Sequence, residues 1–349
     1  MSQEVLQPAG RCELHSRVPA WLPCSRAFTV LSMSCARGLR ASSLLGTPHC
    51  RKLSIGCEHL DACLDGGIDT VGLTEIAGEA GTGKTQFALQ LMLQSQLPVE
   101  SGGLAGGAIY LHGDGPSSQP AMRRFRSLAA DFAARHAGSA ERCGELQSNV
   151  HVRQVETPEE LWEVVDLAIP GIVVEQPVRL LVIDSIAGLY RTPAEGAAAP
   201  SAATHGQRAQ HLVRLAARLK QISHHYDLAV VIINQVSDKP LDEPRRRAAA
   251  PWELGACGTA DGGSRVPALG LAWGSCVNTR LMLTRTRAAE AVGTPSRHLH
   301  VAWSPRLADS SVAFEVTDRG VVGQPPGVMP QLCHAPWMLY DTATSGSPW

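Results

Sequence analysis

Charged and aromatic residues are both scarce in this sequence of 349 residues. Charged side chains make up 18% of it, against about 25% in ordinary globular domains, and aromatic side chains make up only 5%. The formal charge is −1, so the chain cannot hold nucleic acid by bulk positive charge alone. No run of about 18 apolar residues occurs, which argues against a membrane-spanning helix. Apolar residues still reach 44%, which supplies a sizeable core and excludes a wholly disordered protein.

The ten cysteines form no Cys-x-x-Cys pair, and no histidines stand at zinc-ligand spacing from them. A structural zinc site is therefore not expected. The sequence shows no secretory signal, so we expect reduced thiols in an intracellular protein, with a disulfide framework as the less favoured alternative.

Residues 1–50 lack the apolar periodicity of a packed element. No acidic residue occurs between Leu14 and Cys57, whereas six Arg and Lys side chains do. Organelle transit peptides have this kind of composition, but a disordered tail is favoured over one. We therefore expect a disordered or targeting tail at 1–50, an α/β core at 51–325 and an irregular C-terminal tail at 326–349.

Between the two tails, short apolar runs alternate with amphipathic helical patterns. This alternation predicts an α/β fold with a mostly parallel, twisted sheet flanked by helices. The expected strands are residues 72–76, 108–112, 149–155, 179–184, 228–233, 276–284, 298–303 and 312–317. The expected helices are residues 86–96, 122–136, 158–169 and 207–226. Two long segments interrupt the alternation, residues 191–207 and 237–266, and loops of this length are usually functional or disordered.

The strongest chemical signal is the octapeptide at 78–85, which matches G-x-x-x-x-G-K-[ST] between an expected strand and an expected helix. Backbone N–H groups of such a loop surround phosphate oxygens, helped by the positive end of the helix. Lys84 would reach the β- and γ-phosphates, and the Thr85 hydroxyl would bind Mg²⁺. The expected nucleotide-binding residues are Gly78, Glu79, Ala80, Gly81, Thr82, Gly83, Lys84 and Thr85.

Three polar residues at strand ends are candidates for the remaining chemistry. Asp184 closes the strand at 179–184 and, beside a phosphate-binding loop, would orient Mg²⁺ and its water shell. Asp114 is the carboxylate best placed to activate an attacking water, and a turn aspartate between two glycines is the alternative. Gln235 would sense the γ-phosphate or simply cap its strand, two equally supported interpretations. Together with Lys84, Asp114 and Gln235 are the expected catalytic residues.

These motifs, in this order, resemble the RecA-type recombinases. The resemblance covers residues 51–323 and rests on GEAGTGKTQ, on LLVIDS followed by Ala-x-Leu-Tyr-Arg, on the long helix and on VVIINQV. Within that family the sequence is similar to the eukaryotic recombinase paralogues, in a plant-like form. The resemblance implies a RecA-type P-loop ATPase core that uses ATP and Mg²⁺ in homologous recombination and double-strand break repair, including meiotic recombination.

The resemblance also implies partners. The chain would act in the nucleus as a mediator, in a complex with another recombinase paralogue, and would contact recombinase filaments and single-stranded or branched DNA. Residues 191–207 and 237–266 would correspond to the family's two DNA-facing loops. A mitochondrion or plastid is the alternative location, because of the composition of residues 1–50. An autonomous strand-exchange ATPase that forms its own filament on DNA is the alternative function.

Four features depart from the family's pattern. Asp114 stands where the family has a catalytic Glu, which pulls the carboxylate back by about 1.5 Å and would blunt water activation. Arg124 matches the family's adenine-side arginine, but three extra residues separate it from Asp114. Residues 1–50 replace the family's helical N-terminal domain. Residues 237–266 hold five basic and five acidic side chains, so we expect weak DNA binding from this chain alone. Together with the shortened acid Asp114, this predicts a weak DNA-dependent ATPase.

Overall fold

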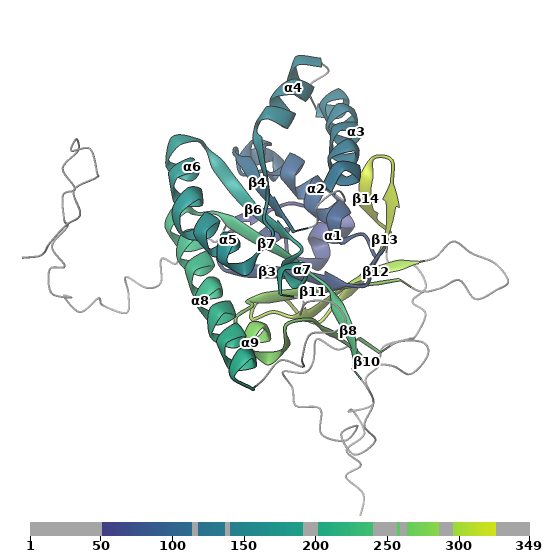
Figure 1. The fold of residues 1–349 in the computed structure, drawn as a ribbon. Helices are drawn as coiled ribbons and strands as arrows, with labels where there is room; N and C mark the ends of the chain where they lie inside the picture. Colours follow the sequence, from purple (N-terminus) through teal and green to yellow (C-terminus); the bar gives the residue numbers. More distant parts are fainter. Residues whose placement is uncertain are drawn as a thin grey trace, which may run out of the picture. The chain divides into compact units, whose positions relative to one another are not determined.

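The computed structural model describes residues 51–113, 118–136, 140–190, 202–239, 257–258, 264–285 and 296–325 (Figure 1). Residues 1–50, Asp114 and residues 326–349, on which the sequence analysis makes predictions, lie outside these ranges. The central feature is a nine-stranded sheet with the order β14-β13-β12-β11-β3-β7-β6-β4-β5. The pairings from β11 through to β5 are parallel and those from β11 to β14 are antiparallel, so the predicted mostly parallel α/β fold is confirmed.

The strands of this sheet are β3 Leu73–Gly78, β4 Gly107–His112, β5 Val150–Gln154, β6 Val178–Asp184, β7 Ala229–Asn234, β11 Thr279–Arg285, β12 Arg297–Trp303, β13 Ser311–Thr317 and β14 Gly320–Gly323. Two smaller sheets pair β1 Lys52–Leu53 with β2 Ile68–Asp69, and β10 Ser264–Pro267 with β8 Val236–Lys239 and β9 Cys257–Gly258. The helices are α1 Glu58–Cys63, α2 Lys84–Gln94, α3 Ser118–His136, α4 Ala140–Ser148, α5 Pro158–Glu163, α6 Ile169–Glu175, α7 Ile186–Leu189, α8 Ala202–Tyr226 and α9 Gly270–Gly274.

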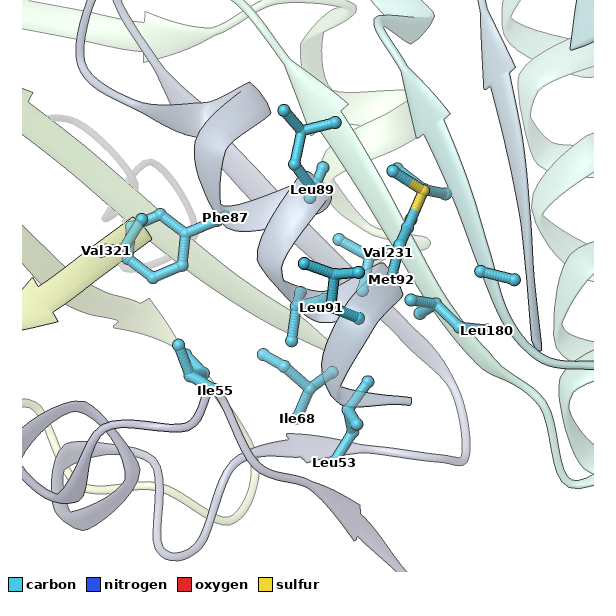
Figure 2. Close-up of a cluster of buried hydrophobic side chains, with 14 of the residues drawn as sticks. Leu53, Ile55, Ile68, Phe87, Leu89, Leu91, Met92, Leu180, Val231 and Val321 are labelled. Atoms are coloured by element: carbon cyan, nitrogen blue, oxygen red, sulfur yellow. The ribbon is translucent and has the colours of Figure 1, made fainter. Parts of the chain in front are cut away.

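Helices cover both faces of β3, β4, β6 and β7, which is why nearly all residues of these four strands are buried. Along β6 and β7, alternate side chains enter two different hydrophobic clusters, as the two-residue repeat of a strand requires. One cluster packs against α2 and α3, and the other against α5, α6 and α8 (Figure 1). In Figure 2, Phe87, Leu91 and Met92 project from α2 into the first cluster. The helix that follows the glycine-rich loop is therefore anchored on the sheet.

Two helices differ from the expected ones. The long helix α8 begins at Ala202 instead of residue 207, because Pro200 prevents a helix from continuing through it but not from starting just after it. The helix expected at 158–169 continues to Glu175, through a π-helical turn at Val164–Ala168 and then α6. Pro170 lies at the start of α6, directly after this π-helical turn.

Part of the segment expected as a loop at 237–266 is strand. Its two ends form β8 and β10, which pair antiparallel with Val236 opposite Pro267. This pairing fixes both ends of the segment next to the end of β7. No helix within the described ranges combines the length and the hydropathy that a membrane span requires.

Candidate nucleotide-binding site

The loop between β3 and α2 follows a tight path that its glycines permit. Gly81 and Gly83 have positive φ angles of 76° and 107°, a region that favours glycine. A Cβ atom on Gly78 would lie only 2.5 Å from the carbonyl oxygen of Leu283 on β11. Gly83 is also the N-cap of α2, so the first turn of this helix presents N–H groups without intrahelical partners. Such a turn is a ready site for an anion.

A pocket of about 920 Å³ lies over this loop, large enough for a nucleoside triphosphate. The predicted site residues that line it are Gly78, Glu79, Ala80, Gly81, Gly83, Lys84, Thr85, Arg124, Asp184 and Gln235. Among the predicted site residues that the structure describes, Thr82 is the exception: its side chain is fully buried, and its hydroxyl donates to the Glu79 carbonyl oxygen at 2.9 Å. Thr82 therefore stabilises the conformation of the loop and does not face the pocket.

The ammonium of Lys84 lies folded against the loop itself. Its Nζ donates to the carbonyl oxygens of Gly78 at 2.8 Å and of Glu79 at 2.6 Å. Burial lowers the pKa of Lys84 to about 8, and the Asp184 carboxylate opposes part of this shift. The ammonium therefore lies at the pocket, and a bound phosphate could replace the two carbonyl oxygens as its hydrogen-bond acceptors.

The two halves of the predicted site meet through Asp184. Its Oδ2 accepts hydrogen bonds from the Thr85 hydroxyl at 2.8 Å and from the Tyr110 hydroxyl at 3.0 Å. Asp184 closes β6 and Thr85 opens α2 next to β3, and only β7 lies between β6 and β3 in the sheet. The sheet order therefore brings together two residues that are 99 positions apart in the chain.

A hydroxyl and a carboxylate suit Mg²⁺, which prefers hard oxygen ligands and usually combines one or two carboxylates with phosphates and water. Among the described residues no group of three or more His, Cys, Asp or Glu side chains is placed to hold a metal by protein ligands alone. The pair Thr85 and Asp184 fits a cation that shares its coordination with a bound triphosphate.

Gln235 and Arg124 lie at the same pocket. The Gln235 side-chain amide donates to the Ser185 hydroxyl at 3.4 Å, which places it beside the end of β6. The Arg124 guanidinium donates through Nε to Gln86 at 3.0 Å and through a terminal nitrogen to the carbonyl oxygen of Thr317. The extra residues before Arg124 thus do not remove it from the pocket.

The pocket also contains residues that the sequence analysis did not assign to it. Arg265 on β10 forms an ion pair with Glu79, and Arg297, at the start of β12, lines the pocket as well. In the sequence, Arg265 is one of ten charged residues of the long segment 237–266. The antiparallel pairing of β10 with β8 brings Arg265 back to the glycine-rich loop at 78–85, and no local sequence pattern predicts that pairing. Tyr110, whose hydroxyl donates to Asp184, lies in the apolar run at 108–112, which predicts a strand but no role at the site.

Asp114 lies outside the described residues. The described residue before it, Gly113, donates its backbone N–H to the carbonyl oxygen of Asp184 at 3.1 Å. In the sheet, His112 on β4 is in register with Asp184 on β6. The role of Asp114 as the acid that activates water stays a prediction.

Nucleotide affinity should fall as the pH rises above about 8, because the charged form of Lys84 attracts phosphate and its pKa in the free protein is about 8. Below this pH the group is protonated before and after binding. Above it, binding must take up a proton, so the affinity should fall by up to about tenfold per pH unit. Calorimetric titration with MgATP at several pH values measures the loss. Lys84→Arg is the control, because its guanidinium keeps its proton and should flatten the profile; a pH-independent wild type would contradict the prediction.

Comparison with known proteins identifies the family to which this chain belongs. The Rad51 family profile matches residues 49–324. The DNA repair protein XRCC3 homolog of Arabidopsis thaliana is 33% identical over 296 residues, which cover 79% of this chain and 94% of that protein. DNA repair protein XRCC3 of Bos taurus is 35% identical over 280 residues, which cover 79% and 75%. The predicted relation to the RecA-type recombinases is confirmed, and the chain belongs to the Rad51 family.

Proposed function

We propose that this chain is an ATP-binding recombinase paralogue that acts as a mediator in homologous recombination and double-strand break repair, including meiotic recombination. The observation that carries the proposal is the hydrogen bond between Thr85 and Asp184, which brings together the two halves of the proposed phosphate and metal site in a chain of the Rad51 family. The relatives from Arabidopsis thaliana and Bos taurus are both named DNA repair proteins, which supports the same process.

ATP and Mg²⁺ are the proposed ligands. The backbone N–H groups of residues 78–85 and the Lys84 ammonium would bind the phosphates. Thr85 and Asp184 would hold Mg²⁺, whose charge offsets that of the phosphates. Gln235 would contact the γ-phosphate, and Arg124 would lie on the adenine side of the pocket.

Hydrolysis by this chain is proposed to be weak. Asp114 is the proposed acid that activates water, and it is one methylene shorter than the Glu that the family uses. A displacement of about 1.5 Å from the reacting geometry lowers a rate by orders of magnitude. A nucleotide that is bound but slowly hydrolysed suits a protein whose nucleotide state controls assembly with its partners.

The proposed partners are another recombinase paralogue, a recombinase filament, and single-stranded or branched DNA. Residues 237–266 carry five basic and five acidic side chains, so they offer few net phosphate contacts. DNA binding by the chain alone should therefore be weak and sensitive to salt. The nucleus is the proposed location, with a mitochondrion or plastid as the alternative.

The test is ATP turnover by the wild type and by Asp114→Glu, each with and without a paralogue partner and single-stranded DNA. We expect slow wild-type turnover and at least about a tenfold gain for Asp114→Glu, because the longer acid reaches the attacking water. Asp131→Glu, at a half-exposed position of α3, is the matched control and should change nothing. Fast DNA-stimulated turnover by the wild type without a partner would contradict the mediator function.

Sedimentation of the wild type with ATP and single-stranded DNA separates the mediator from the autonomous filament-forming ATPase. A mediator that needs a partner should stay in small species under these conditions. Long filaments formed by this chain alone would favour the autonomous enzyme instead.

A further inference from the structure

A buried carboxylate lies three residues before the phosphate-binding loop. Glu75 on β3 has no solvent exposure, yet it carries an acidic side chain in the centre of the sheet. Its Oε1 accepts hydrogen bonds from Asn234 Nδ2 at 2.7 Å and from Trp273 Nε1 at 2.8 Å. Its Oε2 accepts from Arg280 Nε at 2.5 Å. One carboxylate therefore joins four elements, β3, β7, α9 and β11.

Stability alone is a poor explanation for this cluster. Moving an acid and a base out of water is costly, and apolar residues of similar size often replace a buried ion pair without loss of stability. The pair Glu75 and Arg280 is almost completely excluded from solvent. All three donors converge on one carboxylate, so its position is tightly defined. The value of such a cluster lies in the geometry that it fixes.

The cluster reaches the nucleotide pocket through Asn234. The Asn234 side-chain amide donates to Glu75 and, at 3.0 Å, to the carbonyl oxygen of Ala268. Its Oδ1 accepts a hydrogen bond from the backbone N–H of Gln235 at 2.8 Å. The N–H of Ala268 in turn donates to the carbonyl oxygen of Gln235 at 2.8 Å. Both backbone polar groups of Gln235 are thereby held, and its side chain lines the pocket beside Ser185.

We propose that Glu75 is a positioning residue that acts through Asn234 to hold Gln235 toward the γ-phosphate, so that the protein distinguishes ATP from ADP. The inference rests on the proposed function, because it requires that the pocket bind ATP. It adds that the γ-phosphate contact depends on a residue that itself touches no nucleotide. Because β8 begins at Val236, directly after Gln235, the same hydrogen bonds also set where the β8–β10 pair starts.

The test is the ratio of MgATP to MgADP affinity in Glu75→Gln, measured by calorimetry. The neutral amide keeps the size of the side chain but offers one uncharged oxygen to three donors, so at least one donor loses its acceptor and the hydrogen bond that holds Asn234 weakens. We expect MgATP affinity to fall about tenfold, the value of one hydrogen bond to a charged group, while MgADP affinity stays unchanged. Asn234→Ala breaks the same link directly and carries the test if Glu75→Gln does not fold.

Two controls separate positioning from general damage. Trp273→Phe removes one donor from the same carboxylate but leaves the link to Asn234, so it should lower thermal stability and keep the wild-type affinity ratio. In a Gln235→Ala background, Glu75→Gln should have no further effect on the ratio, because the residue through which it acts is gone. MgATP binding by the wild type with an unchanged ratio in Glu75→Gln and Asn234→Ala would overturn this inference alone. A wild type that binds no MgATP would overturn the proposed function, and this inference with it.

Discussion

Lys84→Ala should weaken MgATP binding by about a hundredfold. The ammonium is expected to contact two phosphates, and each hydrogen bond to a charged group contributes about 1.5–3 kcal/mol, with 1.4 kcal/mol equal to a factor of ten. The structure shows the ammonium already inside the loop, bonded to the carbonyl oxygens of Gly78 and Glu79. Isothermal titration calorimetry below pH 8, where Lys84 is protonated, measures the change.

The same variant should not be less stable without nucleotide. The folded-state pKa of Lys84 is about 8, lower than its ordinary value, because burial disfavours the charged form. Below that pH the folded protein therefore carries the desolvation cost of the ammonium, and alanine removes it. If Lys84→Ala loses MgATP binding but resists denaturant as well as the wild type or better, the loss of binding comes from the missing ammonium and not from unfolding. Wild-type affinity in Lys84→Ala would contradict the role of this residue.

Phe87→Ala should lower the free energy of unfolding by about 3–5 kcal/mol, the usual cost of emptying the volume of a phenyl ring in a core. Phe87 is fully buried in α2 and meets the Phe314 ring edge-on at a centroid distance of 5.1 Å. This contact ties the helix after the phosphate-binding loop to β13, so its loss also loosens that loop. Chemical denaturation followed by circular dichroism measures the change.

Val174→Ala is the matched control for Phe87→Ala. Val174 lies on α6 with 74% of its surface exposed, so truncation should change the unfolding free energy by no more than about 0.5 kcal/mol. Equal losses in the two variants would contradict the packing assigned to Phe87.

The position of the glycine-rich loop at 78–85 and that of Asp184 were predictable because each is encoded locally. The loop needs glycines, lysine and threonine at fixed spacing, and Asp184 ends an apolar run. Once the strands are taken as parallel, the carboxyl ends of β3 and β6 must lie on one edge of the sheet. The hydrogen bond from Thr85 to Asp184 agrees with that reasoning.

The other pocket residues depend on pairings between distant segments, which no local pattern shows. Arg265 reaches the pocket only because β10 pairs with β8, and Arg297 only because β12 pairs with β11. Glu75 lies within an apolar run, and the sequence does not predict which residues of β7, α9 and β11 form hydrogen bonds with it. A buried acid in such a run is nevertheless a signal, since an acidic side chain is almost never fully buried without partners.

The position of β3 at the centre of the sheet has a consequence for biosynthesis. This strand leaves the ribosome early, yet its two neighbours are β7 at Ala229–Asn234 and β11 at Thr279–Arg285. A nascent chain must therefore carry an unpaired, apolar strand while about 150–200 further residues are translated, and exposed strand edges of this kind promote aggregation. A message truncated before β11 would yield a polypeptide whose first core strand never finds its second neighbour. We therefore expect folding of this chain during translation to benefit from chaperones that cover the unpaired strand.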